Sequence, residues 1–535
     1  MTTSVPSWQP SLAISAAPLR VGWNPARSGT LQSGLVIGIA TLAAATAVAL
    51  FTADTTVRVA TVGGVLGIAI GMLSGNPRLF CLYCLVLTAP LDLGKRFLAI
   101  PHMGGAGALR FDLVEIFMLA LLFFQGRDIA RGYRSRKDYR IPTVCASWVA
   151  LILLGGIFVA LGPLRRLAVF ELLRMLKCLL LFLIVVNEVV RLKQIGHLVV
   201  ALLCGVMLQA GVGLTQYALG GQLGLKALGE ETEENVKATS EGTLEDREQV
   251  NRVGALLGHS NLLAAYLALL MPVGVALLFT QVDFRIRLLS GTAVLLGTAV
   301  LIATLSRTGW ATFGVAVLGV LLLGSVDRRT GGRHALRRFG AVLVLAVVVL
   351  AFSGPVLKRL FRSDPWSVRN RLEWIDVATR MVLEKPIFGH GLNTFVYQMA
   401  PYTKWGTKQT LFILYGKNLP VVHNNYAIVW AEQGTVGFLF FMALPLHVLY
   451  VGIRNLRIRH ETLFAINLGC MCGLAVMMLD WLVSFSLRTE TVGRVYWMQV
   501  GLLCAIDLWW QRNREAPEAA SREKNLLVPA ASGNV

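Results

Sequence analysis

The stretch NLLAAYLALLMPVGVALLFT, residues 261–280, contains no charged residue. A helix needs about 20 apolar residues to cross the hydrocarbon core of a bilayer. The whole chain of 535 residues has a similar character, with 55% hydrophobic and 15% charged residues and a mean hydropathy of +0.63. Soluble domains carry roughly 25% charged residues. The composition therefore excludes a soluble enzyme, a disordered protein and a secreted disulfide scaffold.

Apolar runs on both sides of this stretch predict an all-α, polytopic membrane protein. We expect about fourteen transmembrane helices, in a range of roughly 11 to 14. The predicted spans are residues 34–51, 59–74, 79–92, 111–126, 142–162, 168–190, 195–220, 261–280, 288–305, 308–325, 339–354, 426–452, 464–486 and 495–510.

The net charge of +20 admits two generic explanations, nucleic-acid binding or a membrane protein with sorted loops. Basic residues in short loops mark the cytoplasmic side of a membrane. Four short segments are basic: Arg127–Arg140, Arg285–Arg287, Arg328–Arg338 and Arg454–Arg459. With fourteen spans, all four fall on one side together with both termini. The charge is thus spread over many loops, which argues against a nucleic-acid partner and assigns this side to the cytoplasm.

This count divides the chain into seven regions. They are a cytoplasmic N-terminal tail (1–33), an N-terminal transmembrane bundle (34–220), an acidic extracytoplasmic loop (221–260), central transmembrane helices (261–354), a large basic extracytoplasmic loop (355–425), C-terminal transmembrane helices (426–510) and a cytoplasmic tail (511–535). Segment 229–250 carries eight acidic residues, which predicts a solvated excursion. Segment 355–425 carries ten basic residues against four acidic ones, which indicates either a solvated surface or an anion site.

Residues 366–386, WSVRNRLEWIDVATRMVLEKP, predict a helix that lies beside the membrane and ends at Pro386. At about 100° per residue, Arg369, a candidate for substrate binding, falls on the polar arc, whereas Arg371 falls inside the apolar arc between Ala378 and Val382. A charge directed at the protein body costs several kcal/mol unless it is paired. Arg371 therefore either snorkels to a carboxylate or carbonyl, or is presented to a buried anion such as a phosphate.

Further polar residues stand at the extracytoplasmic ends of spans. Arg307 lies in the tight turn SRTGW, where an ionisable residue at the bilayer edge is a functional candidate. His423 immediately precedes a span and is a candidate general base, although a helix cap is the simpler interpretation. The other candidates on this side are Arg252, His259, Asn261, Asn424 and Tyr426, with Glu432 inside the following span facing the protein interior.

Motifs for metal or nucleotide binding are absent from the sequence. It contains no D-x-D, H-E-x-x-H or Walker-type pattern, so we expect no metal and no cofactor. Cys81 and Cys84 form a C-x-x-C pair inside the apolar run LFCLYCLVL, which favours a spanning helix over a redox or metal site.

Four motifs, in order, resemble the O-antigen ligase and O-antigen polymerase superfamily over residues 250–440. The motifs are R-x-G…H-S-N from Arg252, SRTGW at 306–310, R-x-x-W…P-x-x-G-x-G from Arg371, and H-N-x-Y…E-x-G-x-x-G from His423. The resemblance implies a GT-C type membrane glycosyltransferase in the bacterial inner membrane, with its active site facing the periplasm. Such enzymes transfer a glycan from undecaprenyl pyrophosphate to a lipid A core or to another glycan acceptor.

By this resemblance, Arg307 and Arg371 neutralise the pyrophosphate, and His423 activates the acceptor hydroxyl. The reaction is expected to be metal-independent and to invert the anomeric centre. The implied partners are the lipid-linked glycan donor, the acceptor and membrane lipids, with no nucleic acid. The acidic insert 229–250 leaves ligase and polymerase both open. A transporter or flippase for a lipid-linked or anionic solute, and a non-catalytic scaffold, remain the competing hypotheses.

Overall fold

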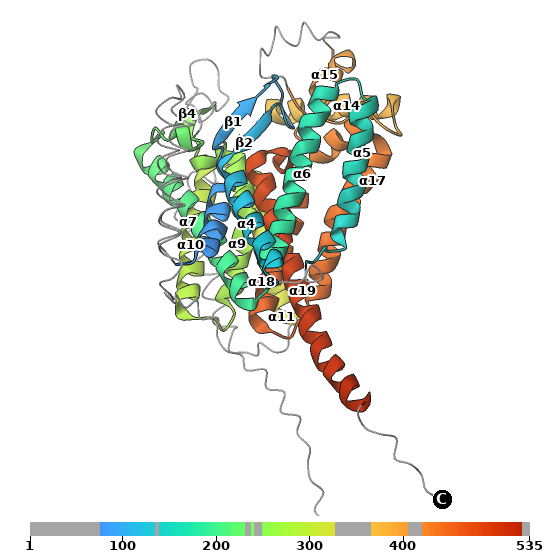
Figure 1. Cartoon of the computed structure of the whole chain (residues 1–535). Helices are drawn as coiled ribbons and strands as arrows, with labels where there is room; N and C mark the ends of the chain where they lie inside the picture. The colour runs from blue at the N-terminus through green and yellow to red at the C-terminus, as the bar shows by residue number, and fades with distance from the viewer. Residues whose placement is uncertain are drawn as a thin grey trace, which may run out of the picture.

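The computed structural model describes residues 75–133, 139–230, 237–239, 249–326, 365–404 and 420–526. Helices dominate these residues (Figure 1). The α-helices are α3 (Pro77–Thr88), α4 (Leu113–Ala130), α5 (Val144–Leu161), α6 (Arg165–Glu188), α7 (Leu192–Leu219), α9 (Ser260–Leu278), α10 (Phe284–Ala303), α11 (Arg307–Val326), α14 (Pro365–Glu384), α15 (Phe395–Gln398), α17 (Asn425–Asn455), α18 (Glu461–Asp480) and α19 (Glu490–Leu526).

The remaining elements are short. Two antiparallel hairpins pair β1 (Gly94–Phe97) with β2 (Leu109–Asp112) and β3 (Lys237–Thr239) with β4 (Gln249–Asn251). The 3-10 turns are η2 (Lys226–Leu228), η3 (Ala255–Leu257), η6 (Ala400–Tyr402) and η7 (Ser486–Arg488). The chain is therefore an all-α protein with small β additions, as the sequence predicts.

Seven of the described helices are long and apolar enough to cross a membrane: α5, α7, α9, α10, α11, α17 and α18. α3 is apolar but shorter, and α4, α6 and α19 carry more charged residues. Each predicted span within the described residues coincides with one of these eleven helices. The predicted spans 34–51, 59–74 and 339–354 lie outside the described residues. The protein is thus a polytopic, all-α membrane protein.

Helices α9 and α18 form the buried centre of the bundle. Their close approach depends on Gly469 and Gly473 of α18. A Cβ atom on Gly473 would come within 2.1 Å of the Leu269 carbonyl oxygen, and one on Gly469 within 2.4 Å of Val273 Cα. Small residues four apart let helix backbones touch in this way inside a membrane. The amide of Gln499 on α19 also donates to the Leu269 carbonyl, at 3.1 Å.

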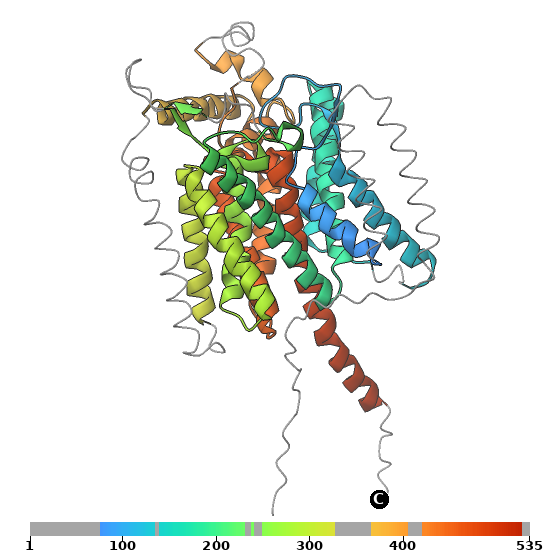
Figure 2. The same ribbon diagram turned by 90° about the vertical axis from the view of Figure 1, so that its left-hand side faces the viewer.

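Two of the basic segments that the structure describes lie at the end of the bundle from which α19 projects (Figure 2). The α9–α10 and α17–α18 connections meet there, because the Gln281 backbone N–H donates to Glu461 Oε1 at 2.9 Å. Arg285 and Arg287 lie in the first turn of α10, Arg454 lies in the last turn of α17, and Arg457 lies in the α17–α18 connection. The described part of the structure thus brings together two basic segments that the count of spans assigns to the cytoplasmic side.

The opposite end carries the β1–β2 hairpin, η3, α14 and the first residues of α9, α11 and α17 (Figure 1). One boundary and the burial of one residue differ here from the sequence prediction. The span predicted to reach residue 486 ends at Asp480, because the carbonyls of Trp481 and Ser484 turn to accept the Asn425 backbone N–H. Glu230, predicted to be solvated, is buried and accepts from Gln216 Nε2 at 2.6 Å.

Candidate functional site

A cavity of about 1190 Å³ opens at the end of the bundle that carries the hairpin and α14. Chain segments far apart in the sequence line it: 92–110, 252–262, 305–308, 480–491, and the single residues Arg371 and His423. Six of the ten predicted site residues line this one cavity, namely Arg252, His259, Asn261, Arg307, Arg371 and His423. These six residues are spread over positions 252 to 423 of the sequence, and the fold brings them together.

Arg307 begins α11 immediately after a tight turn. Leu305 has φ +52°, which reverses the chain, and the Trp310 indole N–H donates to the Leu301 carbonyl at 2.9 Å, tying α11 back to α10. The Arg307 side chain, placed at the first position of the helix, is half-buried on the cavity wall. Among the described residues, no carboxylate lies within ion-pair distance of it.

Arg252 is held in place by neutral groups. Its Nε donates to the Thr304 carbonyl at 3.0 Å, and its Nη2 donates to Asn261 Oδ1 at 2.9 Å. His259 caps α9, since its Nδ1 accepts the Asn261 backbone N–H at 3.1 Å. The R-x-G…H-S-N motif therefore positions one guanidinium and one imidazole on the cavity wall.

Arg371 lies on the buried stripe of α14, one helical step before Trp374, Ala378 and Met381. The apolar arc predicted for this helix is rotated in the structure, because Leu372 is 61% exposed and Trp374 and Met381 are buried instead. Arg371 remains on the inward side and lines the cavity. Helical periodicity thus predicts the inward position of Arg371 correctly, but it predicts the wrong rotation of the apolar arc about the helix axis.

His423 stands on the cavity wall just before α17, where its ring lies 5.2 Å from the ring of Phe485. Desolvation by the surrounding protein, and then the positive charge of Arg371, lower the pKa of His423 from 6.5 to about 4. Burial, followed by the charge of Arg252, likewise lowers the pKa of His259 to about 4. Both imidazoles are therefore neutral at pH 7, and each can accept a proton or a hydrogen bond.

The other four predicted residues lie outside the cavity lining. Arg369 is exposed on α14. Asn424 caps α17 by accepting the Ala427 N–H at 2.9 Å, and the Tyr426 hydroxyl donates to the Met478 carbonyl at 2.7 Å. Glu432 is buried within α17. The last three support the local backbone rather than facing the cavity.

Glu432 organises a sharp break in α17. Its carboxylate accepts the backbone N–H groups of Asn393 and Phe395, both at 3.0 Å, and Arg488 Nη1 at 2.7 Å. At Gly434 the helix is interrupted by φ +63°, and a Cβ atom there would lie 2.3 Å from the Ile387 carbonyl oxygen. The glycines of the P-x-x-G-x-G and E-x-G-x-x-G motifs thus let segment 386–394 lie directly on α17.

Sequence reasoning missed several residues that line the cavity. Arg488, on η7, is buried against Glu432 and also donates to Asn393 Oδ1 at 3.2 Å. His102 contacts the same Asn393 oxygen through Nε2 at 2.7 Å. Asp480 accepts the Ser486 hydroxyl at 2.6 Å. Counting the predicted spans places all three near extracytoplasmic ends of spans, although no motif singles them out.

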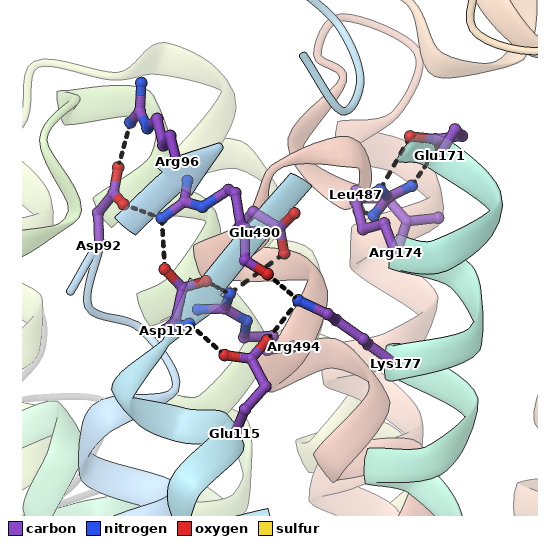
Figure 3. Close-up of polar contacts among 11 residues, drawn as sticks. Asp92, Arg96, Asp112, Glu115, Glu171, Arg174, Lys177, Leu487, Glu490 and Arg494 are labelled. Atoms are coloured by element: carbon purple, nitrogen blue, oxygen red, sulfur yellow. Dashed lines mark hydrogen bonds and ion pairs between the residues drawn. The ribbon is translucent and has the colours of Figure 1, made fainter. Parts of the chain in front are cut away.

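A network of buried and half-buried ion pairs supports one side of the cavity (Figure 3). Arg110 pairs with Asp92 and Asp112, Arg494 pairs with Asp112, and Lys177 pairs with Glu115 at 2.9 Å. These residues join β2 to α4, α6 and α19. Arg494 and Asp112 are both buried, and breaking such a pair leaves an uncompensated charge that costs about 3–5 kcal/mol, so this pair fastens the end of β2 to α19.

The cavity lining has an excess of positive charge. It includes six arginines (Arg96, Arg110, Arg252, Arg307, Arg371 and Arg488) against three carboxylates (Asp92, Asp480 and Glu490). Guanidinium groups bind phosphate oxygens in a forked geometry. Within the described residues, no group of His, Cys, Asp or Glu could hold a metal ion. The arrangement is suited to an anionic, phosphate-containing ligand beside a neutral imidazole.

Fold and site together define a multi-pass membrane protein with an arginine-rich cavity at one end of its helical bundle. Residues 292–442 match the family described as O-Antigen ligase. The match includes Arg307, Arg371 and His423 and confirms the predicted resemblance to the O-antigen ligase superfamily. Residues 292–442 of the chain are thus similar to an O-antigen ligase domain. No curated protein matches the chain.

Proposed function

We propose that this protein is a GT-C type glycosyltransferase that transfers a glycan from undecaprenyl pyrophosphate to an acceptor hydroxyl. One observation carries the proposal. Arg252, Arg307, Arg371 and His423, from four separate segments, line a single cavity, and three of them lie within the matched domain. The cavity lies at the end opposite the basic connections, which favours an active site on the periplasmic side of the inner membrane.

In the proposed reaction, the acceptor oxygen attacks the anomeric carbon of the donor glycan. The bond from that carbon to the pyrophosphate oxygen breaks, and the polyprenyl pyrophosphate leaves with the bonding electron pair. The acceptor hydroxyl loses its proton to His423. Attack from the face opposite to the leaving group inverts the anomeric centre.

Arg307 and Arg371 are proposed to stabilise the leaving group. Negative charge builds on the pyrophosphate in the transition state, and fixed donors act there without reorganisation. Arg252 is already held by Thr304 and Asn261, so it adds a third fixed guanidinium. The mechanism is metal-independent in this proposal, since arginines balance the charge that a metal ion would otherwise balance.

His423 is proposed to be the general base. Its lowered pKa keeps the imidazole deprotonated in the free protein. A bound pyrophosphate opposes the charge of Arg371 and raises the pKa of His423 toward neutrality, which suits proton transfer from a hydroxyl. Asn424, Tyr426 and Glu432 are positioning residues, because their polar groups bind neighbouring backbone or Arg488.

The test uses purified protein in nanodiscs with an undecaprenyl-pyrophosphate-linked glycan. Lipid A core is the acceptor in one arm and a second carrier-linked repeat in the other, with a chelator added to half of each. A new glycoside of inverted configuration, formed equally with chelator, supports the proposal, and the productive arm decides between ligation and polymerisation. In proteoliposomes, translocation of the donor without bond formation would support a flippase, and neither activity would support a scaffold.

A further inference from the structure

The cavity has more lining residues than those assigned to the donor. Pockets for drug-sized ligands occupy about 300–1,000 Å³, whereas this one has about 1190 Å³. The arginines assigned to the donor come from the segment before α9, from α11 and from α14, and the proposed base His423 comes from the residues before α17. A different part of the lining, residues 92–110 with Glu490, is so far without a role.

The β1–β2 hairpin presents two different faces. Arg96 and Arg110 are paired across the strands and line the cavity. The alternate residues point away from them: Lys95 is exposed, Phe97 is 44% exposed and Phe111 is 48% exposed. Successive side chains of a strand point to opposite faces, so neighbouring Lys95 and Arg96 carry the same charge on different sides.

The cavity face of the hairpin is balanced in charge. Arg96 pairs with Asp92 at 2.8 Å, Arg110 pairs with Asp92 and Asp112, and Glu490 pairs with Arg494 at 3.3 Å. Alternating hydrogen-bond donors and acceptors suit the hydroxyl groups of a neutral sugar, and they do not select a dianion. The face differs in this respect from the part of the wall that carries Arg307.

The hairpin is also rigid and separate from the family match. Asp112 is paired with buried Arg494 on α19, and the loop residue Ala106 donates its N–H to Glu171 of α6 at 3.0 Å (Figure 3 shows the pairs around Asp112). Residues 92–110 precede the matched range 292–442. The hairpin therefore forms a fixed part of the cavity wall outside the matched range, where it can contact a second substrate.

We infer that the cavity-lining residues of the β1–β2 hairpin and its loop, among them Asp92, Arg96 and Met103, form the subsite for the glycan of the acceptor. The inference rests on the proposed glycosyl transfer and adds to it the part of the chain that recognises the acceptor. Arg96 and Asp92 donate to and accept from sugar hydroxyls, and Met103, 41% exposed on the cavity lining, borders the sugar ring.

Arg96→Ala, with Lys95→Ala as the matched control, tests this inference. The two changes remove one positive charge from adjacent exposed positions of β1. Binding of the acceptor glycan without turnover is measured for each protein, together with the KM values for acceptor and donor. We expect Arg96→Ala to weaken acceptor binding and raise the acceptor KM roughly tenfold with an unchanged donor KM, and Lys95→Ala to match the wild type. Met103→Trp, a change at an exposed site, should also raise the acceptor KM.

Equal behaviour of Arg96→Ala and Lys95→Ala overturns the inference. It is also overturned if Arg96→Ala raises the donor KM instead, because the hairpin then holds the donor glycan. A wild-type protein that binds no acceptor overturns it as well. A wild-type protein that binds acceptor with the Arg96 dependence, yet forms no glycoside, leaves the subsite standing and removes the proposed reaction.

Discussion

Arg371 occupies a position on α14 that helical periodicity reserves for an apolar residue. It precedes Trp374, Ala378 and Met381 on the buried stripe, and all three are at most 3% exposed. A guanidinium in this position costs free energy unless the surroundings provide charge or hydrogen bonds. Its place on the cavity wall puts the guanidinium within reach of an anion that enters the cavity.

Arg371→Lys is expected to lower the transfer rate on the order of 10²–10³-fold, because an ammonium cannot form the forked contact with a phosphate. Arg380→Lys is the control, since Arg380 lies on the same helix, is exposed and pairs with Asp376 at 2.6 Å. The rate of glycoside formation is measured for protein recovered at equal levels from the membrane. Wild-type rates for Arg371→Lys would contradict the assignment.

The lowered pKa of His423 predicts an unusual pH profile. The base form persists to well below pH 6.5, because the pKa in the folded protein is about 4. The value of kcat/KM, which reports the free enzyme, should therefore stay constant from about pH 8 to pH 5.5 and fall only below that. The acid limb of kcat should lie at higher pH, since bound pyrophosphate stabilises the imidazolium. A kcat/KM value that falls to half near pH 6.5 would contradict the prediction, because His423 would then have the pKa of an ordinary histidine.

Among the elements, α17 and segment 386–394 form the joint on which the site depends. The broken helix receives this segment through the Gly391 N–H, which donates to the Glu432 carbonyl at 2.7 Å, and the Thr435 N–H, which donates to Pro386 at 2.7 Å. The joint links α14, which carries Arg371, to α17, which His423 precedes. The distance between the proposed leaving-group ligand and the proposed base is thus set by backbone contacts.

Gly434→Ala should disrupt this joint. The new Cβ would meet the Ile387 carbonyl at 2.3 Å with φ at +63°, so we expect a loss of stability of roughly 2 kcal/mol or more. Gly314→Ala is the control, because a Cβ there on helix α11 meets no atom within 4 Å. It should be neutral or slightly stabilising. Thermal unfolding in detergent compares the two, and equal midpoints would show that the break tolerates a side chain.

The molecule as a whole separates two kinds of positive charge by the length of the bundle. Arg285, Arg454 and Arg459 lie at the end from which α19 projects, and the cavity arginines lie at the other. Basic residues in short connections orient a membrane protein during insertion. The net charge of +20 is thus divided between orientation and the cavity.

This separation predicts the labelling of single cysteines in intact cells. Lys404→Cys, exposed at the cavity end, should react with a membrane-impermeant maleimide added outside. Arg459→Cys, exposed at the opposite end, should react only after the membrane is opened. The unaltered protein is the control, because its eight cysteines are buried or half-buried within the described residues. The reverse pattern would invert the proposed orientation.

Much of the architecture is readable from local composition. An uncharged run such as 261–280 has to be a membrane helix, since burying its backbone in lipid requires internal hydrogen bonds. The motifs around Arg307, Arg371 and His423 are local in the same way, and their shared side of the membrane followed from counting spans. Each of these properties depends only on neighbours in the sequence or on the number of spans that precede the segment.

Contacts between distant segments were beyond such reasoning. Glu432 looked like a ligand residue, yet its carboxylate is consumed by two backbone N–H groups and Arg488, 56 residues away. Arg96, Arg110 and His102 join the cavity only because β1 and β2 pair and are tied to α19. Whether a polar side chain meets substrate or its own protein depends on which groups surround it in space, and a one-dimensional pattern does not contain those neighbours.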